Sequence, residues 1–312
     1  MKMKVIVIVG PTAVGKTRLG IELAKQFDGE IISGDSMQIY QTLDVGTAKV
    51  TNEEAEGVPH HLIDTKEVTE EYSVADFQKE AREKIKEITK RNRVPIIVGG
   101  TGLYIESLLY NVSHGKGSQK DSQFRKEKNE LADKAGNQIL WEELKTKDSK
   151  AAETIHANNR RRVIRALEVI HTSGEKYSDL QQEKTDSLYD SYTIALTTDR
   201  SMLYERINTR VDWMMQDGLL DEARALWEIR ATVPQASRGI GYKELFSYFD
   251  GTVTLENAVE TIKQNSRRYA KRQLTWFRNR VEVTQWADLI ERPQEINNIK
   301  KRVAIFLENR GE

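Results

Sequence analysis

The stretch VIVIVGPTAVGKT, at residues 5–17, joins a strand pattern to a helix pattern through a glycine-rich loop. It opens with alternating Val and Ile, which is typical of a strand buried on both faces. Residues 10–17 fit the pattern G-x-x-x-x-G-K-[ST], and Leu19, Leu23 and Phe27 then recur on one helical face. A strand before the loop and a helix after it are the context that this motif requires.

The loop is predicted to cradle phosphate groups. Glycine lets the backbone curl so that its N–H groups point inward, and the helix N-terminus adds partial positive charge. Lys16 adds a full positive charge, and the Thr17 hydroxyl is a candidate ligand for Mg²⁺. A turn without a phosphate role is the alternative, which both flanking elements disfavour. The assigned residues are Gly10, Pro11, Thr12, Ala13, Val14, Gly15, Lys16 and Thr17.

Two further strand ends are predicted to lie beside this loop. Apolar strands are expected at residues 30–33 and 95–98, and a helix that begins with a Ser73–Asp76 capping box lies between them. This order predicts an α/β fold, a P-loop-type parallel sheet with helices on both faces. Ligands of such sheets bind at the carboxyl ends of the strands. Three loops meet that condition, at residues 10–17, 34–38 and 99–102.

The composition changes after the first third of the chain. Residues 113–150 are rich in Lys, Glu, Gln and Asp with sparse apolar positions, and a second helix is expected at about 160–172. We therefore predict a helical insertion domain at 113–189, and a catalytic core made of 1–112 and 190–312. The last part of the core, from Leu203 to the end, is predicted to be helical.

Overall composition narrows the class of protein. The 312 residues are 38% hydrophobic and 31% charged, the net charge is zero, and there is no cysteine. Disulfides and thiolate metal sites are thereby excluded, and any affinity for nucleic acid must come from local charge. The chain enters its first strand directly and has no apolar run of membrane-spanning length. We expect a cytoplasmic monomer without a signal peptide or a membrane partner.

Asp35 follows a predicted buried strand beside the phosphate loop. A carboxylate at this place could help to hold Mg²⁺ or act as a general base. The segment from Gly34 to Tyr40 also offers a hydroxyl, an amide and a phenol. The structural alternative is that Asp35 merely caps a short helix.

Thr101 stands among three glycines, in the sequence Gly99-Gly100-Thr101-Gly102 at another strand end. This pattern suggests that the backbone approaches a ligand closely and that Thr101 supplies a hydrogen bond. A tight turn without a ligand is the alternative.

Positive charge gathers in two segments. Arg160, Arg161, Arg162 and Arg165 open one insertion helix, although a solvated helix face would explain them equally well. Residues 261–281 contain seven basic residues and no acid, with aromatic residues at heptad spacing. We expect one stripe of this second helix to be buried and its basic residues to face outward, where they could contact an RNA backbone.

Two smaller patterns are a pair of arginines and a pair of histidines. Arg206 and Arg210 share a helix face, and arginines from a late helix often reach the phosphates in folds of this type, although one of the two could form a surface salt bridge instead. The adjacent His60 and His61 cannot readily chelate one ion together, and we expect a turn in residues 57–61.

Taken together, the chain resembles the tRNA dimethylallyltransferase (tRNA isopentenyltransferase) family. The matching stretches run in the family's order through almost the whole sequence: GPTAVGKT (10–17), GDSMQIY (34–40), DVGTAK (44–49), GVPHHLID (57–64), VGGTGLY (98–104), NNRRRVIRALEV (158–169), LYERINTRVDWM (203–214), GLLDEA (218–223), GIGYKEL (239–245) and RRYAKRQLTWFR (267–278).

The resemblance implies transfer of a dimethylallyl group from dimethylallyl diphosphate to N6 of the adenosine 3′ of the anticodon in tRNA. The phosphate loop and Arg210 would then bind the diphosphate, Thr17 would hold Mg²⁺, and Lys16, Asp35 and Thr101 would be catalytic, with Asp35 as the base. The tRNA anticodon loop would be bound by Asp35, Ser36, Met37, Gln38, Thr101, Gln123, Asn159, Arg160, Arg161, Arg162, Val163, Arg165, Arg268 and Arg272.

The sequence departs from the family at two places. Many members have Asp where Asn159 stands, and residues 115–120 lack the family's Pro- and Asp-containing stretch, which puts the fine tRNA contacts of the insertion, Gln123 included, in doubt. Two rival functions remain: a P-loop kinase of a small metabolite or nucleotide, and an RNA-binding protein whose phosphate loop is only structural.

Overall fold

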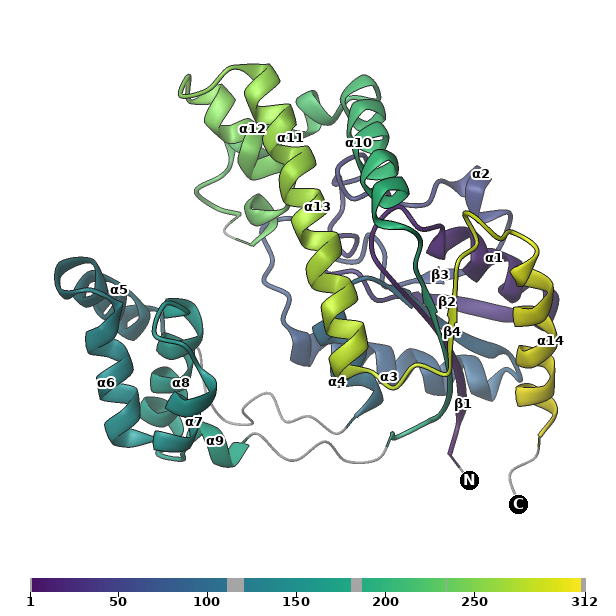
Figure 1. Cartoon of the computed structure of the whole chain (residues 1–312), viewed down its shortest axis with the longest axis horizontal. Helices are drawn as coiled ribbons and strands as arrows, with labels where there is room; N and C mark the ends of the chain where they lie inside the picture. Colours follow the sequence, from purple (N-terminus) through teal and green to yellow (C-terminus); the bar gives the residue numbers. More distant parts are fainter. Residues whose placement is uncertain (1, 111–120, 181–186, 234, 310–312) are drawn as a thin grey trace. The chain divides into compact units, whose positions relative to one another are not determined.

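The computed structural model describes residues 2–110, 121–180, 187–233 and 235–309 (Figure 1). The chain divides into two compact units. One contains Met1–Leu109 and Ser187–Glu312, and the other is Tyr110–Asp186. The predicted insertion, 113–189, lies within three residues of the second unit at either end.

A six-stranded sheet forms the centre of the first unit, in the order β3-β2-β4-β1-β5-β6. Every neighbouring pair is parallel. The predicted P-loop-type parallel α/β sheet is therefore confirmed. Its strands are β1 (Lys4–Val9), β2 (Gly29–Ser33), β3 (His60–His61), β4 (Val94–Gly99), β5 (Asp190–Leu196) and β6 (Gln285–Ala287).

The other elements of this unit are helical, and some of them flank the sheet (Figure 1). They are α1 (Lys16–Phe27), α2 (Asn52–Ala55), α3 (Val74–Lys90), α4 (Gly102–Leu109), α10 (Arg200–Gln216), α11 (Leu219–Glu228), the 3₁₀ turn η1 (Ala236–Arg238), α12 (Tyr242–Phe249), α13 (Leu255–Arg280) and α14 (Glu295–Glu308). The predicted capping box opens α3, since Ser73 and Asp76 each accept a backbone N–H of the other. No helix among the described residues is both long and apolar enough to span a membrane.

The core of this unit lies on both sides of the central strands. Residues 5–9 of β1 are fully buried, as expected of a strand that has parallel neighbours and helices on either side. Leu19 and Leu23 of α1, Ile207 of α10 and Val303 of α14 belong to the same apolar cluster. The alternating Val and Ile of the opening sequence are thus the centre of the core.

Two predictions about the strands were wrong. His60 and His61, expected in a turn, form the edge strand β3, where they pair with Ile31 and Ile32 of β2. The C-terminal part, expected to be helical throughout, contains β6 beside β5. Both strands are only two or three residues long, so their pairing depends on a neighbour that is distant in sequence.

The second unit is helical in its described residues, with α5 (Ser122–Ala135), α6 (Asn137–Lys147), α7 (Ser149–Thr154), α8 (Arg160–Ser173) and α9 (Tyr177–Leu180). It has an apolar core of its own, which includes Leu140, Leu144 and Leu167. A fully buried carboxylate, Glu168, accepts two hydrogen bonds from Arg125, at 2.6 and 2.7 Å. The unit therefore combines a thin core with a buried ion pair.

Glu30 is a buried carboxylate of the first unit, at 3% exposure in β2. It accepts from Arg91 at 2.6 Å and from Arg93 at 3.2 Å, and His61 Nε2 lies 2.6 Å from its Oε2. Burial alone would raise the pKa of Glu30, but the hydrogen bonds from Arg91, His61 and Arg93 outweigh it and lower that pKa. The carboxylate ties the edge strand β3 and the α3–β4 turn to β2.

We predict that Glu30→Gln lowers the free energy of unfolding by about 1–3 kcal/mol at neutral pH, because the acceptor of these hydrogen bonds then loses its negative charge. The folded pKa lies below the unfolded value of 4.5, so the contribution is complete above pH 4.5 and is lost as the pH falls through the folded pKa. Urea unfolding at several pH values would measure this, with exposed Glu83→Gln of α3 as the control. Equal stability of the two variants, or a difference that persists in acid, would contradict the prediction.

Candidate functional site

The loop of residues 10–17 connects β1 to α1, in the strand–loop–helix order that the motif requires. Three of its residues have a left-handed backbone, with φ of 144° at Gly10, 67° at Ala13 and 88° at Gly15. A Cβ on Gly10 would lie only 2.5 Å from the Leu196 carbonyl oxygen, so that position requires glycine. The curled backbone leads directly into the N-terminus of α1, which is an arrangement suited to an anion.

Three cationic side chains converge on this loop. Lys16 Nζ donates to the Pro11 carbonyl at 2.6 Å. Arg206 Nε donates to the Ala13 carbonyl at 2.9 Å, and Arg210 lies 3.4 Å from the Thr12 hydroxyl. Both arginines therefore reach the loop from α10, which leaves no role for either as a remote surface salt bridge.

Burial lowers the pKa of two of these cations, Lys16 and Arg210. Burial, followed by the charge of Arg210, lowers the pKa of Lys16 to about 7, although Asp35 acts in the opposite direction. Burial also lowers the pKa of Arg210. Positive charge that is held together at such a cost is stabilised when an anion binds between the cations.

A cavity of about 1230 Å³ opens in front of the loop. Its wall consists of the phosphate loop with α1, the segment from Asp44 to Thr51, and α10. Apolar and charged side chains alternate around it, including Arg206, Trp213 and Met214 of α10. The space is large enough for a diphosphate and a short organic group.

Oxygen ligands for Mg²⁺ are available in this cavity. Thr17 lines it, as do the carboxylates of Asp44, Glu54 and Glu205. Within the described residues, no three His, Cys, Asp or Glu side chains form a cluster that could hold a metal ion. A hard cation that keeps its waters and binds through phosphate oxygens and one hydroxyl fits this set, as Mg²⁺ commonly does.

Asp35 lies at the end of β2, in a segment that is not helical. Its Oδ1 accepts from the Met37 backbone N–H at 2.9 Å, so the carboxylate closes a local turn. The alternative that Asp35 caps a helix is therefore wrong. The local bond fixes one carboxylate oxygen and leaves the other available for a proton.

Thr101 joins the β4 loop to the β2 loop. Its hydroxyl accepts from the Ser36 backbone N–H at 3.1 Å and lies 3.4 Å from the Ser36 hydroxyl. Tyr269 of α13 also hydrogen-bonds to Thr101, and burial raises the pKa of this tyrosine to about 12, so its hydroxyl stays neutral. Asp35, Ser36 and Thr101 thus form one connected group at the carboxyl ends of β2 and β4.

The glycines around Thr101 serve packing inside the chain, whereas the sequence suggested close approach to a ligand. A Cβ on Gly99 would lie 2.4 Å from the Gly34 carbonyl oxygen. On Gly100 it would lie 2.3 Å from Gln273, and on Gly102 it would lie 2.4 Å from Trp276. The missing side chains let β2 and α13 come close to the β4 loop.

Gln273 is a site residue that sequence reasoning missed. It is 5% exposed, accepts from the Thr12 backbone N–H at 3.1 Å and donates to the Gly100 carbonyl at 2.9 Å. A single amide therefore connects the phosphate loop to the β4 loop. Its signal in the sequence was a polar residue on the buried stripe of a helix.

Gln38, predicted to contact tRNA, uses its amide inside the chain. Its oxygen accepts from the Ser33 hydroxyl at 3.0 Å, and its nitrogen donates to the carbonyls of Thr47 and Ala48 at 3.2 and 3.4 Å. Met37 and Ser36 are partly exposed beside it.

The basic helix α13 has the expected buried stripe, which includes Ile262, Ala270 and Phe277. Its outward basic residues include Arg268 and Arg272, which are exposed. Two others are only partly exposed and bind neighbouring side chains, contrary to the prediction that all face outward. Lys263 Nζ lies 2.6 Å from Asp212, and Arg267 donates to Asn208 at 2.6 Å.

In the second unit, two of the predicted RNA-binding arginines are in ion pairs. Arg160 donates to Asp133 at 2.6 Å, and Arg165 donates to Glu168 at 2.7 Å. Arg161 is exposed and Arg162 is partly exposed. The cluster therefore has fewer uncommitted charges than the sequence suggested.

The remaining predicted residues of this unit differ in exposure. Val163 is fully buried in the apolar core, so the prediction of a tRNA contact through its side chain is wrong. Asn159 caps α8, with its side chain 3.4 Å from the Arg162 N–H, and is exposed. Gln123 is exposed on α5 and donates to Glu127 at 2.8 Å.

Relatives of the chain are identified by sequence. Residues 38–280 match the IPP transferase family model. The chain is 58% identical over 309 residues to the tRNA dimethylallyltransferase of Enterococcus faecalis, with 98% of each chain covered. It is 54% identical over 289 residues to the enzyme of the same name from Bacillus cereus, covering 92% of this chain and 90% of the relative.

Solved structures give the same answer. The full-length tRNA isopentenylpyrophosphate transferase from Bacillus halodurans is 48% identical with a TM-score of 0.74, covering 98% of this chain and 97% of that one. A eukaryotic dimethylallyltransferase described as acting on tRNA is 31% identical with a TM-score of 0.80, covering 99% and 80%. The chain therefore belongs to the IPP transferase family.

Proposed function

We propose that this chain transfers a dimethylallyl group from dimethylallyl diphosphate to N6 of the adenosine 3′ of the anticodon in tRNA. Its membership of the IPP transferase family favours this reaction over small-molecule phosphorylation. The observation that carries the proposal is the pairing of a cation-lined phosphate loop with a neighbouring carboxylate, Asp35, whose charge acts on Lys16.

The donor half of the reaction needs a stabilised leaving group. In transfer, the bond from the allylic carbon to oxygen breaks and the diphosphate departs with its electron pair. Lys16, Arg206 and Arg210 surround the loop on which it would rest. Preorganised charge of this kind contributes several kcal/mol, because it needs no rearrangement as the negative charge develops.

The acceptor half needs a base. The N6 lone pair of adenine is delocalised into the ring, so the amine becomes a better nucleophile only as its proton leaves. Asp35 would accept that proton through the carboxylate oxygen that does not bind the Met37 N–H. Thr101 would hold the base by a hydrogen bond. The new bond joins N6 to the allylic carbon, and pyrophosphate is the second product.

Mg²⁺ would bind beside the departing diphosphate. Thr17 is the protein ligand that we propose, and the ion would supply additional charge neutralisation when bound. The tRNA backbone would be bound by exposed basic residues, among them Arg161 of α8 and Arg268 and Arg272 of α13. The target base must leave the anticodon-loop stack, which costs a few kcal/mol.

We predict that the wild-type protein incorporates label from dimethylallyl diphosphate into unmodified tRNA, and that Asp35→Asn lowers the rate roughly 10²–10⁴-fold by removing the base. Binding of both substrates should remain nearly intact. A radiolabel transfer assay and filter binding would measure the two effects. ATP with small acceptors serves as the comparison for a kinase. Lost substrate binding would instead make Asp35 structural, and wild-type protein without transfer activity would refute the proposed function.

We predict that affinity for inorganic pyrophosphate falls as the pH rises above about 7. Lys16 has a pKa of about 7 in the free protein, and a bound anion favours its charged form, so binding takes up a proton at higher pH. Calorimetric titrations from pH 6 to 9 would measure the change. Lys16→Arg stays charged throughout and therefore corrects for titration of the ligand. Parallel pH profiles for the two proteins would contradict the prediction.

We predict that Arg268→Glu together with Arg272→Glu weakens tRNA binding and reduces its dependence on salt, because fewer phosphates are neutralised. Affinity for pyrophosphate should not change. The matched control is Lys301→Glu with Arg302→Glu, which reverses two exposed charges on α14. Equal tRNA affinity of the two double variants would exclude this surface of α13.

A further inference from the structure

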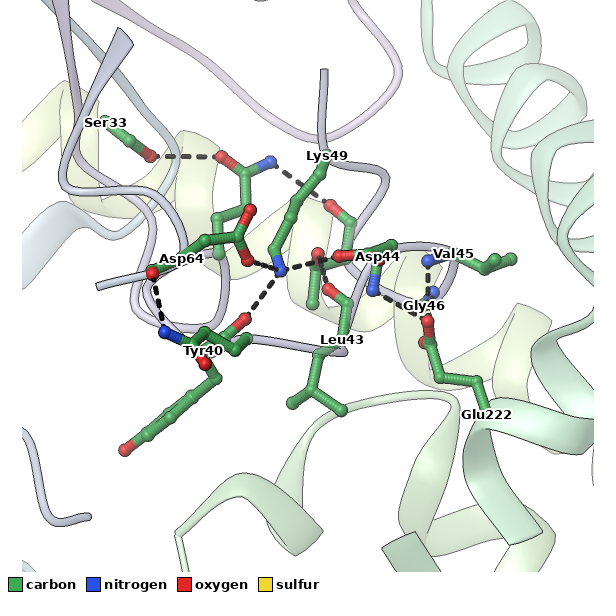
Figure 2. A network of polar contacts seen from close by, with 12 residues as sticks. Ser33, Tyr40, Leu43, Asp44, Val45, Gly46, Lys49, Asp64 and Glu222 are labelled. Atoms are coloured by element: carbon green, nitrogen blue, oxygen red, sulfur yellow. Dashed lines mark hydrogen bonds and ion pairs between the residues drawn. The ribbon is translucent and has the colours of Figure 1, made fainter. Parts of the chain in front are cut away.

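One polar network brings together residues from four stretches of sequence. None of these stretches has a role in the proposed mechanism. These stretches are residues 44–49, 57–64, 218–223 and 239–245. Residues of the first three stretches meet around the loop that follows Leu43, as Figure 2 shows. Tyr242 of the fourth stretch joins the network through Glu222. Glu222 of α11 lies at one end of this network, and Lys49 lies at the other.

Glu222 binds three successive backbone N–H groups. Its Oε2 accepts from Asp44 at 2.7 Å and from Val45 at 2.9 Å, and its Oε1 accepts from Gly46 at 2.9 Å (Figure 2). The Tyr242 hydroxyl donates to Oε1 at 2.7 Å as a fourth hydrogen bond. Consecutive N–H groups that point to one place form a concave anion site, which this chain fills with its own carboxylate.

Buried residues hold the loop of residues 44–49 at both of its ends. Tyr242 is 1% exposed, and a Cβ on Gly46 would lie 2.6 Å from its hydroxyl oxygen, so Gly46 allows the close approach. At the other end of the loop, Lys49 is nearly buried. Its ammonium donates to the Tyr40 carbonyl at 2.5 Å and to Asp44 at 2.7 Å, and it also pairs with Asp64 (Figure 2).

This loop forms part of the site in two ways. Asp44, Val45 and Ala48 line the cavity in front of the phosphate loop. The carbonyls of Thr47 and Ala48 accept both hydrogen bonds of the Gln38 amide nitrogen, three residues after Asp35. A shift of the loop would therefore move the segment that is proposed to receive the adenine.

We propose that Glu222 is a positioning residue for prenyl transfer, which holds the loop of residues 44–48 and thereby fixes Gln38 and the segment after Asp35. The inference rests on the proposed function. Lys16, Arg206 and Arg210 contact the phosphate loop itself, whereas Glu222 contacts residues 44–46. Glu222 therefore acts on the loop beside the acceptor segment, and the cations at the phosphate loop keep their own contacts.

The test uses the full chain with Glu222→Gln, which keeps the size of the side chain but places an amide NH₂ against N–H donors. We expect kcat for transfer to fall roughly 10- to 100-fold, because charge-assisted hydrogen bonds are lost. Pyrophosphate affinity should stay within about twofold, since the variant leaves every cation at the phosphate loop in place. Glu228→Gln, an exposed carboxylate at the end of the same helix, is the matched control and should leave kcat unchanged.

Two further readouts separate positioning from general destabilisation. Amide hydrogen exchange should quicken at residues 44–46 and stay unchanged in β1 and β4. In a Gln38→Ala background, Glu222→Gln should cost much less than in the wild type, because the segment has already lost its anchor to the loop. Tyr242→Phe removes one of the four hydrogen bonds and serves as a milder variant if Glu222→Gln does not fold.

Unchanged kcat, an equal loss in the Gln38→Ala background, or a loss of pyrophosphate affinity that parallels the loss of rate would overturn the inference. Continued protection of the amides of residues 44–46 in the variant would do the same. Absence of transfer by the wild type would refute the proposed function, whereas the exchange experiment would still test the contact of Glu222 with the loop.

Discussion

Parallel pairing of β2, β4 and β1, which are neighbours in the sheet, is the constraint on which the site depends. Parallel strands end at the same edge, so the loops after these three strands are brought together there, and contacts through Thr101 and Gln273 then join them. The Gly34 N–H donates to the Val98 carbonyl at 2.8 Å, which extends the ladder by one step beyond β2. Asp35 and the phosphate loop are therefore brought to the same edge by backbone hydrogen bonds.

Gathering positive charge at the phosphate loop has an electrostatic cost. The loop gathers Lys16, Arg206 and Arg210 around a curled backbone, and burial lowers the pKa of Lys16 to about 7. In the free protein, the Pro11 carbonyl accepts the hydrogen bond of the lysine. In the proposed reaction a diphosphate would relieve the repulsion among these cations, so binding energy would be available where negative charge develops.

The opening strand, the phosphate loop and α3 could be predicted from sequence because their signals are local: alternating Val and Ile, a fixed glycine spacing, and a capping box at Ser73. The strands β3 and β6 could not, because they are too short to show a period and form only beside a distant partner. Val163 was assigned to RNA from a motif, although its position on the apolar face of α8 buries it. Gln273 was missed because its partners are backbone groups 173 and 261 residues away.

Helix α13 presents two different surfaces. Gln273 and Trp276 face the phosphate loop and the loop after β4, whereas Arg268 and Arg272 are exposed. The inner positions are constrained by contacts with glycine backbone, in which even one extra atom would collide. The exposed positions, Arg268 and Arg272, are not constrained in this way. Substitutions at the exposed charges can therefore change the surface of this helix without disturbing the packing of Gln273 and Trp276 beneath it.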